Sequence, residues 1–97
     1  MKVLAIGSLV NEITPAQRDE FMPREVPATL KLYLDGKIEQ YWFREDKPSV
    51  VFLMNSGSVD DAQATLNTLP LTANGLMTFD LMPVGPLAPL GMLIQAK

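Results

Sequence analysis

The sequence predicts an α+β fold, in which four antiparallel strands form one sheet and two helices cover one of its faces. Strand-like and helix-like patterns follow one another in the order strand, helix, strand, strand, helix, strand. The chain has 97 residues, 47% of them hydrophobic and 20% charged, which is typical of one soluble domain with one core. Two helices cover only one face of four strands, so we expect a partner to cover the second face.

The first strand and the start of the first helix are marked by short patterns. Residues 2–10 form an apolar run that predicts a strand covered on both faces. Thr14 then suits the cap of a helix, and Pro15 suits its first turn. Gln17 follows at the position where the side chain of a capping box bonds back to the backbone.

Two prolines in the next segment predict an interrupted helix. Pro23 and Pro27 each lack a backbone donor and clash with the preceding helical turn. We therefore expect one helix over about 15–22 and a second piece over about 25–35, which Gly36 ends. Apolar residues recur through the second piece at helical spacing: Val26, Leu30 and Tyr33 or Leu34.

The middle of the chain predicts a hairpin of two strands. Residues 37–45 are rich in Ile and aromatic residues, and residues 49–55 form a second apolar run beyond the turn. If the residues at the ends of the turn face each other, Trp42 faces Val51. One face then holds Ile38, Gln40, Trp42, Arg44, Val51 and Leu53, and the other holds Glu39, Tyr41, Phe43, Val50, Phe52 and Met54. A slip of one residue in the pairing would exchange the two sets.

The last part of the chain predicts a helix, a strand and an apolar tail. Ser58 suits a helix cap, and Pro70 ends the helix. The apolar stripe of this helix recurs at helical spacing: Val59, Ala62, Leu66 and Leu69. The last strand is expected over residues 76–83. We expect residues 1–84 to form the ferredoxin-like domain, and the strongly apolar residues 85–97 to pack on a neighbouring subunit.

Composition excludes several classes of function. The chain has no Cys and no His, so disulfides, thiolate nucleophiles, Cys-bound metals and histidine bases are excluded. A net charge of −3 without a basic cluster disfavours nucleic-acid binding. No stretch approaches the ~20 consecutive apolar residues that cross a bilayer, so we expect a cytoplasmic protein that does not enter membranes.

Three segments of the sequence resemble one known family. They are GKIEQYWFR at 36–44, SVDDA at 58–62 and LNTLPL at 66–71. Together they resemble the muconolactone isomerase family of the dimeric α/β-barrel superfamily, without gaps from about residue 36 to residue 71. The Trp of the second strand and the TLPL sequence at the end of the second helix are the most telling features.

The resemblance implies a dimeric α/β barrel, in which ferredoxin-like subunits pair through their sheets as a homodimer and some assemble into larger homo-oligomers. It also implies an isomerase-like enzyme of aromatic compound catabolism, which moves a proton on a small carboxylate- or lactone-bearing ring compound without metal or organic cofactor. Cofactor-free monooxygenases and cyclases are relatives in the same superfamily. The alternative is a non-catalytic member that binds a small organic ligand or serves assembly.

Three side chains of the hairpin are the predicted substrate-binding residues. Arg44 can hold a carboxylate or enolate bidentately, unless it is a solvated residue paired with Glu45 or Asp46. Trp42 offers an aromatic wall, or else packs in the core or in a dimer interface. Gln40 in mid-strand needs a hydrogen-bond partner, which a ligand, a water or a second subunit can supply.

Two carboxylates are the predicted catalytic residues. Asp80 lies midway along the last strand, where burial in a barrel would favour the neutral acid that proton transfer needs. Glu39 is the second candidate if the register turns its side chain inward. For both residues, the alternative is an exposed carboxylate without a catalytic role.

Overall fold

Four strands form one antiparallel sheet in the computed structural model, which describes residues 1–86 of the chain. The elements follow the predicted order: β1 (Lys2–Leu9), α1 (Pro15–Leu34), β2 (Ile38–Phe43), β3 (Val50–Asn55), α2 (Val59–Leu66), α3 (Pro70–Ala73) and β4 (Met77–Val84). The strand order in the sheet is β2-β3-β1-β4, and each neighbouring pair is antiparallel. The predicted ferredoxin-like α+β fold is thereby confirmed.

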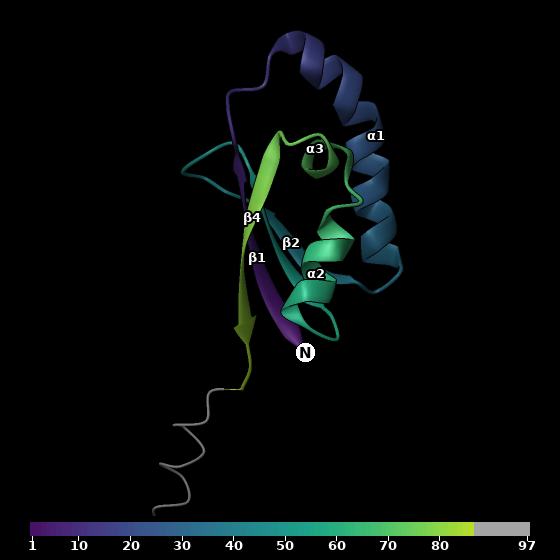
Figure 1. Cartoon of the computed structure of the whole chain (residues 1–97), viewed down its shortest axis with the longest axis vertical. Coiled ribbons are helices and arrows are strands. Elements are labelled where there is room, and N and C mark those ends of the chain that lie inside the picture. The colour runs from purple at the N-terminus through teal and green to yellow at the C-terminus, as the bar shows by residue number, and fades with distance from the viewer. Residues whose placement is uncertain (87–97) are drawn as a thin grey trace, which may run out of the picture.

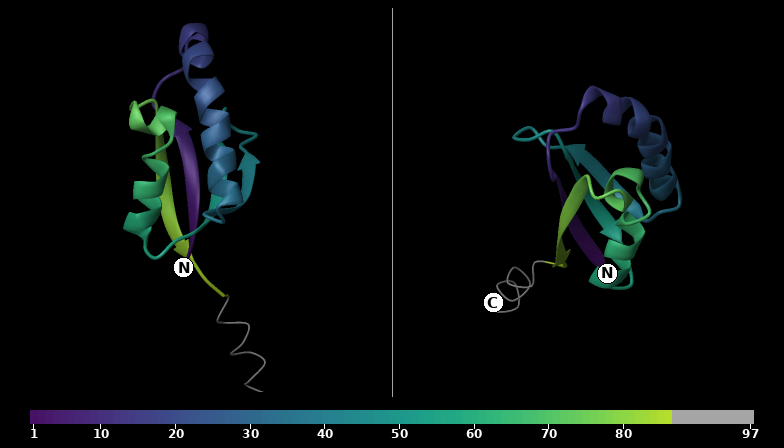
Figure 2. Two further views of the ribbon diagram at one scale, coloured as in Figure 1. Left: turned by 90° about the vertical axis from the view of Figure 1, so that its right-hand side faces the viewer. Right: turned by 45° about the horizontal axis from the view of Figure 1, so that its top comes forward.

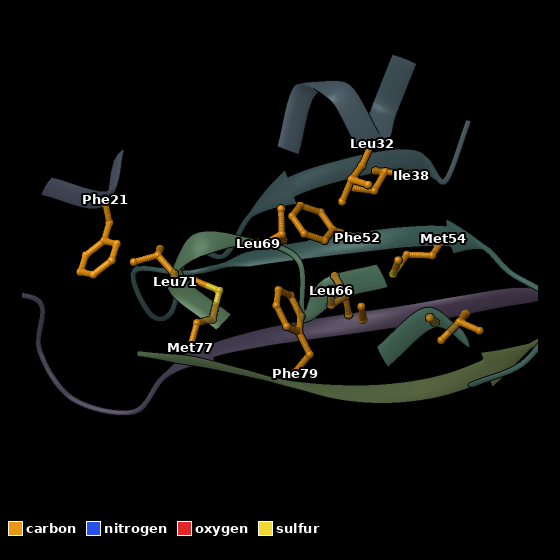
Figure 3. Close-up of a cluster of buried hydrophobic side chains, with 13 residues drawn as sticks. Phe21, Leu32, Ile38, Phe52, Met54, Leu66, Leu69, Leu71, Met77 and Phe79 are labelled. Atoms are coloured by element: carbon orange, nitrogen blue, oxygen red, sulfur yellow. The ribbon is translucent and has the colours of Figure 1, made fainter. Parts of the chain in front are cut away.

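The helices lie on one side of the sheet (Figures 1 and 2). Helix α1 packs against β2 and α3, and α2 packs against β4. The strand residues that face these helices form the core, with Val3, Ala5 and Met54 fully buried. Phe52 of β3 stacks on Phe79 of β4 with ring centroids 5.7 Å apart. Figure 3 shows both rings among the buried side chains of the core. The core therefore lies between the sheet and its helices.

The opposite face of the sheet, here called the open face, has no helix over it in the described part of the chain (Figure 2). It is formed by the strand side chains that alternate with the core residues: Lys2, Leu4, Ile6, Ser8, Gln40, Trp42, Val51, Leu53, Thr78, Asp80 and Met82. Its aliphatic centre is only half-buried, and Trp42 is 48% exposed. The open face is thus the surface for which the sequence predicts a partner.

Helix α1 is continuous over 20 residues, so the expected break near its prolines was wrong. Pro23 and Pro27 lie one helical turn apart, and both are exposed. The carbonyls that lose their hydrogen-bond donor are those of Asp19 and Pro23, which also lie on the exposed side of the helix. Water can solvate these carbonyls, and the helix therefore continues past both prolines.

The predicted helix caps are confirmed. The Thr14 hydroxyl accepts from the Gln17 backbone N–H at 3.1 Å, and the Thr14 N–H donates to the Gln17 side chain at 3.0 Å, which completes a capping box. The Ser58 hydroxyl accepts from the N–H of Asp61 at 3.0 Å. Pro70 follows the end of α2 as predicted, but it also begins α3, because proline suits the first turn of a helix.

The predicted strand register is confirmed near the turn of the hairpin, where Trp42 faces Val51. At the other end of β2 the register shifts at Glu39, and Ile38 faces Met54. Ile38 is therefore 1% exposed on the helix side, whereas the sequence predicted it on the same face as Trp42. The physical reason is the extra residue of the irregularity, which reverses the side-chain alternation beyond it.

Strand β4 ends at Val84, and Gly85 and Pro86 follow it as exposed residues. The rest of the apolar segment 85–97, which the sequence predicts to pack on a neighbouring subunit, lies outside the described residues. In residues 1–86, none of the helices has both the length and the apolar character needed to cross a membrane.

Candidate functional site

Arg44 is held by hydrogen bonds within the chain, at one end of the open face. Its Nε and Nη2 donate to the two carboxylate oxygens of Asp46 at 2.9 and 2.7 Å. Its Nη1 donates to the Gly7 carbonyl at 3.0 Å and to the Ser8 hydroxyl at 3.2 Å. The hydrogen bond with Asp46 raises the pKa of Arg44, and the same bond lowers the pKa of Asp46. The guanidinium thus joins the β2–β3 turn to β1, and most of its donors are used.

Gln40, Trp42 and Asp80 lie on the open face but do not form one site. Gln40 and Trp42 belong to β2, and Asp80 belongs to β4. These strands are the two edges of the sheet, so about 14 Å of sheet separates them at the usual strand spacing. Arg44 reaches across to β1, and the charge of Asp80 contributes to the raised pKa of Arg44. The structure therefore brings Asp80 towards Arg44, but away from Gln40 and Trp42.

Glu39 forms an ion pair at the opposite end of the sheet. Its Oε2 lies 2.7 Å from the Lys2 Nζ, and both side chains are about two-fifths exposed. Lys2 also donates to the Asn55 side chain. Glu39 is thus part of a row of polar groups across β1, β3 and β2, at the end of the sheet opposite to Arg44.

A cavity of ≈300 Å³ lies on the helix side of the sheet, between α1 and the edge strand β2. Its walls are largely apolar and aromatic: Met22, Glu25, Val26, Thr29, Leu30, Tyr33, Tyr41, Trp42, Phe43, Val50, Phe52, Leu71 and Met77. Tyr33 of α1 and Tyr41 of β2 meet edge to face with ring centroids 5.1 Å apart. Of the five predicted site residues, Trp42 alone borders this cavity.

Glu25 is the one acidic residue that lines this cavity, and it is 7% exposed. Its Oε1 accepts from the backbone N–H of Leu71 at 2.9 Å. Its Oε2 has a long contact of 3.5 Å with the hydroxyl of Thr29, which also donates to the Glu25 carbonyl at 2.9 Å. One carboxyl oxygen is therefore firmly held, while the other has only a weak partner in the described part of the chain.

The environment of Glu25 favours its neutral form. Burial raises the pKa of Glu25, and the hydrogen bonds from Leu71 and Thr29 oppose this effect without cancelling it. The carboxyl also has a structural role, because Leu71 lies in the first turn of α3 and that helix has no side-chain cap at its N-cap residue. Glu25 supplies an acceptor for one of the free N–H groups of α3.

Sequence reasoning missed Glu25 because the expected break in α1 hid the continuous pattern of the helix. Phe21, Glu25, Ala28 and Leu32 recur at helical spacing along the inner side of α1. Three of the four are apolar, and Glu25 occupies the remaining inward position. A charged residue within a buried helical stripe is the signal that could have identified it.

A second, wider cleft of ≈740 Å³ lies where the β1–α1 loop meets the β2–β3 turn. It shares five lining residues with the cavity: Met22, Phe43, Val50, Leu71 and Met77. Its other walls include polar and charged residues: Ser8, Asn11, Glu12, Arg18, Lys47 and Ser49. The cavity and the cleft are therefore neighbours with a common wall.

In residues 1–86, no three acidic side chains come together to form a metal site. No model of a known protein family matches the chain, and the search of curated proteins gives no match.

Proposed function

We propose that the chain is a cofactor-independent, isomerase-like enzyme that transfers a proton on a small ring compound bearing a carboxylate or a lactone, with Glu25 as the acid and base. The observation that supports this proposal is the carboxyl of Glu25 in an apolar cavity, where burial raises its pKa. General acid–base catalysis works best when the pKa of the group lies near the working pH. The reaction class is the one implied by the resemblance to muconolactone isomerases, but the proposed site lies on the helix side.

The residues of the cavity suggest how the transfer would proceed. The ionised carboxyl takes a proton from a carbon next to a carbonyl group, and the resulting acid returns it to another carbon of the same conjugated system. The Leu71 N–H holds Oε1, so that Oε2 is available for the transfer. The walls are largely apolar, and a volume of ≈300 Å³ suits one substituted ring.

The test is deuterium incorporation from D₂O into a panel of unsaturated lactones and ring carboxylates, followed by NMR. We expect Glu25→Gln to slow exchange at the activated carbon by about 10²–10⁴-fold, which is the usual contribution of a positioned acid or base. Gln keeps an acceptor for the Leu71 N–H, so the fold should be retained. Asp80→Asn on the open face is the matched control and should leave the rate unchanged.

Two results would decide against this function. Exchange that is lost in Asp80→Asn and retained in Glu25→Gln would place the chemistry on the open face. Compounds that bind the cavity, detected by fluorescence of the single Trp, but never exchange a proton would favour the non-catalytic binding protein instead.

The open face supports a second role, in assembly. We also propose that two copies pair through this face, because its aliphatic centre is half-buried while Trp42 and Met82 are 48% and 52% exposed. Analytical ultracentrifugation should give a dimer for the wild type and a monomer for Leu53→Asp. A wild-type monomer at micromolar concentration would contradict this role.

A further inference from the structure

We infer that the ligand of the cavity is an elongated amphipathic anion, whose apolar part lies beside Glu25 and whose negative group is held in the neighbouring cleft by Arg18 and Lys47. This inference rests on the proposed function, since it takes the cavity between α1 and β2 as the ligand site. It adds a second subsite and defines the shape and charge of the ligand.

The first argument is that the two spaces adjoin each other. The cavity of ≈300 Å³ and the cleft of ≈740 Å³ are both bordered by Met22, Phe43 and Leu71, and also by Val50 and Met77. These five shared residues are all apolar. An elongated molecule lying against these shared residues would occupy both spaces, whereas a single compact ring in the cavity would leave the cleft empty.

The second argument is the charge of the cleft. Arg18 comes from the first turns of α1 and Lys47 from the β2–β3 turn, so two different elements bring a cation to the same space. In the described part of the chain, neither residue makes a salt bridge. Glu12 is the one acid that lines the cleft, and the nearby Asp46 is already paired with Arg44. The cleft thus has an excess of positive charge in a protein whose net charge is −3.

A third observation is the hydroxyl of Ser49. Ser49 lines the cleft and is 5% exposed, and its Oγ has no hydrogen-bond partner among the described residues. A buried hydroxyl without a partner costs free energy, and a turn of the Ser49 side chain towards the cleft would give it a polar ligand atom as partner. The two cations and this hydroxyl together suit an oxygen-bearing anion such as a carboxylate.

The experiment compares phenylalkanoates of increasing chain length with the phenylalkanols of equal length, with binding followed by Trp fluorescence and calorimetry. We expect the acids to bind more tightly than the alcohols once the chain is long enough to reach the cleft. The double variant Arg18→Gln/Lys47→Gln should then bind the long acids about tenfold more weakly, because charge-assisted hydrogen bonds are lost. Its affinity for the alcohols should be unchanged. Glu12→Gln should bind the acids slightly more tightly, because it removes a negative charge from the cleft.

Lys31→Gln/Lys37→Gln is the matched control, because it removes the same charge from exposed residues that line neither space. It should leave the affinity of the long acids unchanged. Equal affinity of the acids for the wild type and Arg18→Gln/Lys47→Gln would overturn the inference and leave the cavity intact as a site. Thr29→Trp fills the cavity with a large side chain. Alcohols that bind the wild type no more tightly than they bind Thr29→Trp would instead overturn the proposed function.

Discussion

The two faces of the sheet accommodate charged side chains in opposite ways. On the open face, Arg44 pairs with Asp46, and Lys2 pairs with Glu39, each within 2.7 Å. On the helix side, Glu25 is buried among apolar residues and is held by a backbone N–H rather than by a cation. Exposed ion pairs are common and mainly structural. A buried acid without a cation is costly, and such groups are concentrated at functional sites.

The largest effect is expected from substitutions at two neighbouring residues of β3 whose side chains face opposite sides of the sheet. Phe52 is 2% exposed on the helix side, whereas Leu53 is half-buried on the open face. Phe52→Ala should lower the free energy of unfolding by about 3–5 kcal/mol, because it removes a buried ring and leaves a cavity. Leu53→Ala should cost about 1 kcal/mol in the monomer. Urea unfolding at low protein concentration measures both losses of free energy. Equal losses for the two variants would contradict the difference between the two faces.

The next effect tests how tightly the helix side is packed around β1. A Cβ at Gly7 would lie 2.8 Å from the Ser49 Oγ, 2.9 Å from the carbonyl oxygen of Val50 and 3.0 Å from the Phe79 ring. Gly7→Ala should therefore cost about 1–3 kcal/mol, because the Val50 backbone cannot move aside without disturbing β3. Gly85→Ala, with no atom within 4 Å of the added carbon, is the control and should have no effect on the melting temperature.

The stability should change with pH in opposite directions for ionisable groups of the two faces. The larger change is expected for Glu25. Because its pKa is raised in the folded protein, the folded state binds the proton at a higher pH than the unfolded chain does. The stability of the wild type relative to Glu25→Gln should therefore rise as the pH falls from neutral towards the ordinary value of 4.5. Thermal unfolding of both proteins across this range measures the difference, and a constant difference would contradict the account.

The smallest effect is expected for the exposed Arg44–Asp46 pair. Because the pKa of Asp46 is lowered in the folded protein, its contribution is present above the ordinary value of 3.8 and is lost as the pH falls below it. The stability of the wild type relative to Asp46→Asn should thus fall with decreasing pH, opposite to the trend for Glu25. A difference that stays constant as the pH falls would show that the pair is not formed in solution.

The sequence predicted the fold because each element has its own local signal. The capping box at Thr14, the cap at Ser58 and the turn-side register of Trp42 are all set by residues close in the chain. What local signals could not provide was the solvation of the helix around Pro23 and the irregularity at Glu39. Both depend on which side of an element meets water after the chain has folded.

The candidate site was less accessible to prediction than the fold. The predicted residues Gln40, Trp42 and Arg44 do share the open face, as the register implied. The cavity beside Glu25, however, is formed by α1, β2, β3, α3 and β4 together. The contact between Glu25 and Leu71 joins residues 46 positions apart, and no spacing rule in the sequence reveals such a pair.

The most direct test of the account is a ¹³C NMR titration of the Glu25 carboxyl in the folded wild-type protein, with Glu25→Gln used to assign the resonance. The account predicts a pKa above the ordinary value of 4.5, because the cost of burying the charge exceeds the gain from the Leu71 and Thr29 hydrogen bonds. A pKa at or below 4.5 would mean that the carboxyl is well solvated or fully stabilised as an ion. That result would contradict Glu25 as the acid and base of the cavity.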